Sequence, residues 1–303
     1  MISKNRQEEV KILSTTLSRH ELASKFGVEV DTIRRYLSYN KEIPKAPKIL
    51  IFDIETMFMT VSVWGISFKQ RIPADNIIED WNALSWSAKW LFDSEIMSDV
   101  LTSEEAIARD DSRVLKSIWK LLDESDIVIA HNGNKFDLRK LNARFIQQGL
   151  TPPLPYRSID TLKVAKRYFA FSSYTLKFLC KMFGLSPKIH TGYELWKQCL
   201  KGDEEALKKM KQYNIGDILS LEELYLKLRP WIKSSVNFGV YMDTEESVCP
   251  NCGGKDLEWK GQYTTTAGRF KTFRCSNCGA IGRSRYSELG KEQRRNLTVS
   301  VAR

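Results

Sequence analysis

The sequence predicts an α/β protein in which helices flank a mixed β-sheet, with a small helical domain before it and a β-rich cysteine module after it. Three observations carry this prediction. The apolar stretch ILIFDIE opens a long region in which strands come first and then alternate with helical patterns. A charged helical segment precedes this region, and two CxxC pairs follow it. The chain has 303 residues, 42% of them hydrophobic, which is enough for one large packed domain with smaller flanking ones.

Changes in composition along the chain mark the expected domain boundaries. Prolines and a loss of apolar periodicity separate the helical start from the sheet region, and a second such change precedes the cysteines. We expect a helical domain (1–40), a linker (41–48), the α/β domain (49–235), a linker (236–246), the cysteine module (247–287) and a basic, partly disordered tail (288–303).

The first segment has the outline of a helix-turn-helix. An apolar helix face ends at Phe26, Gly27 suits the turn, and a second helix would carry Arg34 and Arg35 on its exposed side. This outline resembles the helix-turn-helix of small DNA-binding domains, where such arginines meet DNA. A plain helical hairpin packed on its neighbour is the alternative.

The sheet region predicts a specific order of strands and helices. Strands are expected where apolar residues are continuous or alternate, and helices where they recur at helical spacing. The expected strands are ILIFDIE, VSVWGISF, IIEDW, ALSWSAKWLF and IVIAH, and the expected helices cover residues 103–123, 136–148 and, with breaks at Gly184, Pro187, Gly192 and Gly202, residues 173–229.

Charge and hydropathy limit the partners and the location. The chain has 47 Lys and Arg against 37 Asp and Glu, and its net charge of +10 favours a polyanionic partner, although many unrelated proteins are also basic. No stretch approaches the roughly 20 apolar residues that span a bilayer, and MISKNRQEEVKIL lacks the continuous apolar region of a signal peptide. We therefore expect a cytoplasmic protein without a membrane partner.

Two carboxylates stand one residue apart at the end of the first strand. Asp53 and Glu55 alternate with Ile54, so both acids project from one face of the strand while Ile54 points into the core. Acids on one face repel each other, and a divalent cation is the simplest relief. A strand edge with solvated acids is the alternative that this motif alone leaves open.

Further carboxylates follow a later strand and lie in a late helix. Asp137 comes after IVIAH and a glycine-bearing turn that contains Asn132, although an Asp in this position is more often a helix cap. Tyr213 and Asp217 are one helical turn apart and therefore share a helix face. Each pattern is weak in isolation.

Together the motifs occur in one order: D-x-E at a first strand, N-x-x-x-F-D after a later strand, and Y-x-x-x-D in a late helix. In this order they resemble the tyrosine subtype of the DEDD superfamily of 3′→5′ exonucleases, the DnaQ-like branch of the ribonuclease H-like fold. The resemblance covers roughly residues 48–230 and implies two Mg²⁺ or Mn²⁺ ions. The implied metal ligands are Asp53, Glu55, Asp137 and Asp217.

The resemblance also implies roles for residues around the acids. Tyr213 would assist the attacking water, and Asn132 with the backbone near Thr56 would hold the terminal nucleotide. The turn NGNKFD is one residue longer than the commonest family form, so Asn132 and Asn134 compete for that contact. Lys177, in a segment similar to the family's S-x-x-L stretch, could line the path of the nucleic acid.

Two further stretches have structural interpretations. ALSWSAKWLF looks like the tryptophan-lysine segment of relatives in this superfamily, where it belongs to a sheet strand, and we expect core packing there rather than stacking on bases. Asp160 precedes a helical pattern, so we expect a helix N-cap and not a metal ligand.

The cysteine module predicts a structural zinc site. Its two CxxC turns are separated by 22 residues, and each is followed by a glycine. Four thiolates in two such turns form a closed tetrahedral Zn²⁺ site, and the module looks like a zinc ribbon with its hairpin within residues 263–273. The predicted zinc ligands are Cys249, Cys252, Cys275 and Cys278.

These observations predict a metal-dependent 3′→5′ exonuclease acting on DNA, with the flanking domains holding the substrate. A nuclease of the same fold acting on RNA or on structured DNA is an alternative, because four acids do not distinguish these substrates. A nucleic-acid-binding regulator with an inert nuclease-like domain is a second alternative, and the complete set of acids argues against it. The compact size resembles phage-encoded members of the superfamily, which act in the host cytoplasm.

Overall fold

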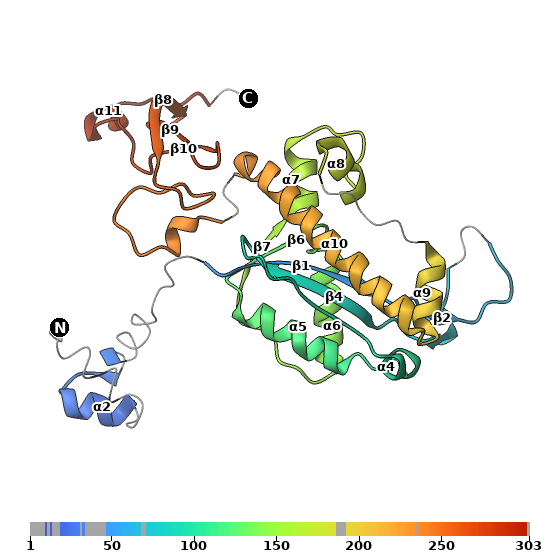
Figure 1. Cartoon of the computed structure of the whole chain (residues 1–303). Helices are drawn as coiled ribbons and strands as arrows, with labels where there is room; N and C mark the ends of the chain where they lie inside the picture. Colours follow the sequence, from blue (N-terminus) through green and yellow to red (C-terminus); the bar gives the residue numbers. More distant parts are fainter. Residues whose placement is uncertain are drawn as a thin grey trace. The chain divides into compact units, whose positions relative to one another are not determined.

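The computed structural model describes residues 10, 13, 19–30, 32–33, 47–67, 71–185, 192–233 and 236–301 (Figure 1). The chain has two structural units. Residues 1–45 with 240–243 form the first, and residues 46–239 with 244–303 form the second. Within the described part of the chain, no helix combines the length and the apolar character needed to cross a membrane.

The first unit has a small helical core. Helix α2 (Arg19–Phe26) ends at Gly27, whose φ of 62° lets Val28 N donate to Ala23 O at 3.0 Å. Leu22 and Ala23 pack with other apolar side chains around this turn. The helix and its glycine turn agree with the sequence, whereas Arg34 and Arg35 lie outside the described residues, so DNA contact by this unit stays a prediction.

A five-stranded mixed sheet forms the centre of the second unit (Figure 1). Its order is β5-β4-β1-β6-β7, with β1 antiparallel to β4 and parallel to β6. The apolar residues of β1 are buried throughout, as a central strand requires. The strands are β1 (Ile49–Thr56), β4 (Ala83–Trp90), β5 (Met97–Val100), β6 (Ile127–Ala130) and β7 (Arg157–Asp160).

Helices cover both faces of this sheet. The long helix α10 crosses β1 and β4 in Figure 1, and α5 lies on the other side. The helices are α4 (Ser103–Ala108), α5 (Ser112–Glu124), α6 (Asp137–Gln147), α7 (Thr161–Tyr168), α8 (Leu176–Phe183), α9 (Tyr193–Leu200) and α10 (Glu204–Leu228), with short 3-10 turns η1 (Ala74–Asn76), η2 (Arg229–Trp231) and η3 (Phe238–Val240).

Strand β4 is anchored to a different helix on each face. Trp86 donates from Nε1 to Val114 O on α5 at 3.0 Å, whereas Lys89 forms an ion pair with Glu222 on α10. An odd number of positions separates Trp86 from Lys89, so they project from opposite faces. The prediction that ALSWSAKWLF is a packed strand is therefore confirmed.

Two predicted elements differ from the structure. Of the described part of VSVWGISF, residues 61–67, only Val61 lies in a strand, as the end of β2 (Thr60–Val61), which pairs with the short β3 (Ile77–Glu79). Trp64 and Ile66 are fully exposed. Alternating apolar residues make a strand only where a partner strand is available, and β3 is too short to provide one.

The helix expected over residues 103–123 is also interrupted. Arg109 adopts a left-handed conformation with φ of 54°, which ends α4 and separates it from α5. The reason is tertiary, because the Asp111 carboxylate turns into the core and binds Arg144 at 2.6 and 2.7 Å. A buried ion pair therefore replaces one turn of helix.

The cysteine module folds as a three-stranded sheet in the order β10-β9-β8. Its strands are β8 (Leu257–Thr265), β9 (Gly268–Cys275) and β10 (Ile281–Arg283). The tail is more ordered than expected, because Glu288 N donates to Arg269 O at 2.7 Å and α11 (Lys291–Arg295) follows.

Candidate active site

Three carboxylates converge on the face of β1 that lies against α10. Asp53 and Glu55 project from the end of the strand, and Asp217 comes from α10. One oxygen from each carboxylate can be chosen so that all three lie within 4.8 Å of one another. Ile54, between the two strand acids, is buried in the core on the other face. The structure therefore brings together three of the four predicted ligands.

The position of Asp217 depends on a firmly anchored helix. Asp203 caps the start of α10 by accepting a hydrogen bond from Ala206 N at 2.7 Å. Further along, Glu222 pairs with the buried Lys89 and accepts a hydrogen bond from Phe92 N at 3.0 Å. These contacts fix the register of α10 against β4, and Asp217 itself is 2% exposed.

Asn214 holds one of the strand acids, a role that the sequence analysis missed. Its Nδ2 donates to Asp53 Oδ2 at 2.7 Å, and the residue is fully buried. Asn214 precedes Asp217 by three positions, so both face the sheet from the same side of α10. This i, i+3 spacing within YNIGD was the available signal, but it did not indicate which side chain Asn214 would reach.

Asp137 contributes the fourth carboxylate from the start of α6. Its Oδ1 accepts a hydrogen bond from Ile54 N at 3.2 Å, and its side chain is buried. Burial raises the pKa of Asp137 to about 7 against the opposing effect of the hydrogen bond from Ile54 N, and the nearby Asp160 carboxylate adds to the rise. The turn before it requires glycine, because a Cβ on Gly133 would lie 2.4 Å from the Cβ of Ala130.

All four acids line one cavity of about 630 Å³. Asp137 belongs to this cavity but not to the group of three close carboxylates. Lys166 lines the cavity too, with its Nζ 5.8 Å from the centre of the Tyr174 ring. The site therefore combines a cluster of acids with a cation, which suits a ligand that carries both a metal ion and a phosphate.

The turn between β6 and α6 distinguishes Asn132 from Asn134. Asn132 lines the cavity with φ of 69°, and its N donates to Asp160 Oδ1 at 3.0 Å. The side chain of Asn134 instead accepts a hydrogen bond from the Ser158 hydroxyl. Asp160 also accepts hydrogen bonds from the first amides of α7, so the prediction of a helix N-cap is confirmed.

Three other predicted residues do not belong to the described lining of the cavity that holds the acids. Thr56 lines a second cavity, of about 520 Å³, together with aromatic side chains that include Trp196. The Tyr213 ring meets the Trp196 ring edge-on at 6.0 Å between centroids and is not among the described residues that line the first cavity. Lys177 is exposed on α8 and lines neither cavity.

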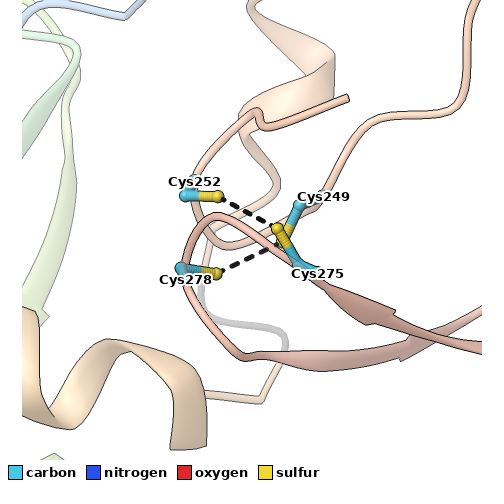
Figure 2. A group of neighbouring side chains, drawn as sticks. All are labelled: Cys249, Cys252, Cys275 and Cys278. Carbon is cyan, nitrogen blue, oxygen red and sulfur yellow. Dashed lines mark hydrogen bonds between the residues drawn. The ribbon is translucent and has the colours of Figure 1, made fainter. Parts of the chain in front are cut away.

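The four cysteines form a second site in the C-terminal module. Figure 2 shows their sulfurs facing one another from two loops, and the Cys249–Cys278 and Cys252–Cys275 sulfur pairs are each 3.7 Å apart. Four ligands at a Zn–S distance of about 2.3 Å would place the sulfurs about 3.8 Å apart in a tetrahedron. Gly254 N also donates to Cys252 Sγ at 3.4 Å. The cluster therefore fits a structural zinc ion.

The loop of the first cysteine pair is hydrogen-bonded to the backbone that follows α10. Asn251 donates from Nδ2 to Arg229 O at 2.8 Å and to Ile232 O at 2.9 Å. Phe238 N donates in turn to Pro250 O at 2.9 Å. These bonds satisfy backbone groups just beyond α10 that would otherwise need water.

Comparison with known proteins identifies the central part of the chain. Residues 93–229 match the family described as the RNase_H superfamily, a range that includes Asp137 and Asp217 but starts after Asp53 and Glu55. Over 137 residues the chain is 28% identical to the PolC-type DNA polymerase III of Ureaplasma parvum serovar 3. This match covers 45% of this chain and 9% of that protein.

A solved structure with some similarity is the family B DNA polymerase from the archaeon Pyrobaculum calidifontis. The match has a TM-score of 0.46 and 18% identity, and it covers 61% of this chain and 25% of the polymerase. Since the chain spans about a tenth of the PolC-type relative, the activity of that whole protein does not transfer with the match. The middle of the chain therefore matches the RNase H superfamily and has an RNase H-like α/β fold.

Proposed function

We propose that this protein is a divalent-metal-dependent exonuclease that removes nucleotides from the 3′ end of DNA. The observation that carries the proposal is the convergence of Asp53, Glu55 and Asp217 within 4.8 Å, with Asp137 lining the same cavity. Such a concentration of carboxylates between a strand and a helix is unfavourable unless a cation neutralises it.

The donor set supports Mg²⁺ or Mn²⁺ as the metal. The acids offer oxygen atoms only, which hard cations prefer. His131 also lines the cavity, but its Nδ1 lies 2.9 Å from Thr161 Oγ1 and its Nε2 lies 2.9 Å from Tyr174 O. Both ring nitrogens are thus engaged away from the acids. Two such ions would supply an activated water and stabilise the leaving oxygen of a phosphodiester.

The residues of the chain divide the remaining tasks. Asp53, Glu55, Asp217 and Asp137 hold the ions, and Asn214 fixes the orientation of Asp53 through its 2.7 Å hydrogen bond. We assign Tyr213 the orientation of the attacking water, since it lies one helical turn before Asp217. A phenol with its usual pKa near 10 is a poor base, so orientation rather than proton removal is the proposed role.

The polarity of cleavage and the substrate class are inferred from the motif order and from a relative. The order of the acid motifs supports 3′→5′ polarity, and the similarity to a PolC-type DNA polymerase III supports DNA. Asn132 and Lys166 line the same cavity as the acids and would bind the terminal nucleotide and its phosphate.

Digestion of end-labelled substrates tests the proposal. Single-stranded DNA, duplex DNA and RNA, each labelled at the 3′ or the 5′ end, are incubated with Mg²⁺ or Mn²⁺. We expect the label on the 3′ end of DNA to be released at once as a mononucleotide. The strand that carries its label on the 5′ end should become shorter stepwise. Asp53→Ala should abolish cleavage, and Glu205→Gln, which alters an acid exposed at the start of α10, should not.

Each other outcome has a definite meaning. Equal or preferred cleavage of RNA would replace DNA as the substrate class, and internal cuts would replace the exonuclease by a structure-specific nuclease. If neither metal supports a cleavage that Asp53→Ala removes, the chain is a nucleic-acid-binding protein with an inert nuclease fold.

A further inference from the structure

One face of the C-terminal sheet gathers aromatic and arginine side chains from all three strands. The Arg283 guanidinium on β10 lies 3.9 Å from the centre of the Phe270 ring on β9 and 5.8 Å from that of Tyr263 on β8. Tyr263 and Phe270 are direct cross-strand partners. Their rings therefore lie side by side beneath a planar cation.

Strand register places two more side chains on this face. Arg274 and Phe270 are four positions apart on β9 and so share a face, and Ile281 lies directly opposite Arg274. Tyr263 is 51% exposed and Ile281 67% exposed, so the face is open to solvent. We call the group Tyr263, Phe270, Arg274, Ile281 and Arg283 the aromatic ribbon face.

The positive charge of the chain is concentrated in the module that carries this face. Residues 255–295 contain ten Lys or Arg against four Asp or Glu. In residues 47–235 the two classes are nearly balanced, with 27 Lys or Arg against 24 Asp or Glu. The three strands, which the structure describes in full, carry one acid, Glu258, against five basic residues. Residues 255–295 therefore account for most of the excess of basic over acidic residues in the chain. The cysteine cluster does not explain this excess, because a structural zinc site needs no basic residues.

We propose that the aromatic ribbon face binds single-stranded nucleic acid. A base would stack on the exposed Tyr263 ring and on the guanidinium of Arg283, which lies 3.9 Å from the centre of the Phe270 ring. Arg274 and the other basic side chains of the module would meet the phosphates on either side. The surface is separate from the acid-lined cavity, and this proposal does not depend on the nuclease activity proposed above.

The chemistry favours nucleic acid over a protein partner. Protein interfaces are also enriched in aromatic side chains and arginine but are depleted of lysine. Residues 255–295 contain four lysines besides their six arginines, which suits a polyanionic partner. Interleaved aromatic and basic groups on an open sheet face suit unpaired bases, because every base offers a flat ring and every nucleotide a negative charge.

Binding to a 30-nucleotide single strand, measured by fluorescence anisotropy with the full chain, tests the proposal. All variants carry Asp53→Asn, and Mg²⁺ is left out, so that the strand stays intact. Tyr263→Leu keeps an apolar side chain but removes the ring, and we expect affinity to fall roughly 5- to 100-fold. Arg283→Ala should weaken binding and lower the slope of log K against log salt by about 0.7.

Matched controls separate stacking from charge and from unfolding. Lys208→Ala removes an exposed positive charge from α10 and should change affinity less than twofold. Arg283→Lys keeps the charge but loses the flat group, and it should bind nearly as weakly as Arg283→Ala. Zinc content, measured for each variant, establishes that the module is still folded.

The possible results either support or overturn the proposal. It stands if Tyr263→Leu and Arg283→Lys bind weakly while they retain zinc and Lys208→Ala binds like the parent. Unchanged affinity in the zinc-loaded Tyr263→Leu variant overturns it and leaves the face to a protein partner. A uniform loss that includes Lys208→Ala also overturns it. Because binding is measured without cleavage, failure of the nuclease proposal would leave these results unaffected.

Discussion

Asn214 holds the carboxylate of Asp53, although the two residues are 161 positions apart in the chain. The amide nitrogen of Asn214 donates to Asp53 Oδ2 at 2.7 Å, across the contact between α10 and β1. Because Asp217 lies three residues further along the same helix, one rigid element both presents one carboxylate and orients another. The geometry of the acids therefore depends on the packing of α10 as well as on the acids themselves.

Removing this amide should weaken the metal site without unfolding the protein. Asn214→Ala is expected to lower metal affinity or activity about 10- to 100-fold, because Asp53 loses the donor that orients it. Cleavage measured across a Mg²⁺ titration checks this. Asn76→Ala is the control, because it removes an amide that bonds Ser62 O and that does not belong to the lining of the acid cavity. A wild-type Mg²⁺ dependence in Asn214→Ala would contradict the role assigned here.

The raised pKa of Asp137 predicts a pH-dependent demand for metal. In the metal-free protein this carboxyl has a pKa of about 7, so below pH 7 it holds a proton that a cation must displace. The Mg²⁺ concentration for half-maximal cleavage should therefore rise as pH falls from 7 to 6, by up to about tenfold. Above pH 8 the Asp137 carboxyl is ionised and this dependence should vanish. A half-maximal concentration that is constant from pH 6 to 8 would show that Asp137 does not bind the ion.

Loss of the buried Lys89 should destabilise the central domain. Lys89→Met leaves the Glu222 carboxylate buried without its cation, and we expect a loss of about 3–5 kcal/mol in the free energy of unfolding. Urea denaturation measures this. Lys89→Met combined with Glu222→Gln should recover part of the loss, since the neutral amide can still accept from Phe92 N. Lys208→Ala, which breaks an exposed pair, should stay within about 1 kcal/mol of wild type.

Replacing one cysteine should unfold the C-terminal cysteine module while the central domain stays folded. Cys252→Ser removes a thiolate from the four-sulfur cluster, so the purified protein should lose its zinc and the C-terminal sheet should unfold. Metal analysis and circular dichroism check this, and Cys180→Ala, a buried thiol on α8, should retain zinc. We expect the Cys252→Ser variant to cleave short single strands still, because the four acids lie in the central domain. Complete loss of that cleavage would place the zinc module within the active site.

The acids were predictable because their pattern is local. Alternation at Asp53 and Glu55 and one helical turn between Tyr213 and Asp217 fix which side chains share a face, whatever the tertiary structure. The structure brings Asp53, Glu55 and Asp217 together as the motif order implied. Tyr213 lies on the predicted helix, but its contact with Trp196 could not be foreseen from spacing.

The errors arose where tertiary contacts override local pattern. Nothing near Asp111 in the sequence indicates that its carboxylate will bind Arg144. This ion pair lies where the helix expected over residues 103–123 is interrupted. Trp64 and Ile66 alternate as in a strand, but neither pairs with a strand among the described residues, and both are exposed. Asn214 was overlooked because its partner is distant in the chain and only the fold brings the two together.

The register of β1 against β4 places the acids of β1 on one face of the strand and its core side chain Ile54 on the other. Ile54 lies opposite Trp86 and faces α5, whereas Asp53 lies opposite Ser87 on the side of α10. Substitution at one of these positions affects one task, catalysis or core packing. Insertion or deletion of one residue within the strand would exchange the two sides, placing carboxylates in the core and isoleucine on the side of α10, where the acids now lie. Evolution and engineering can therefore vary the residues of this strand far more freely than its length.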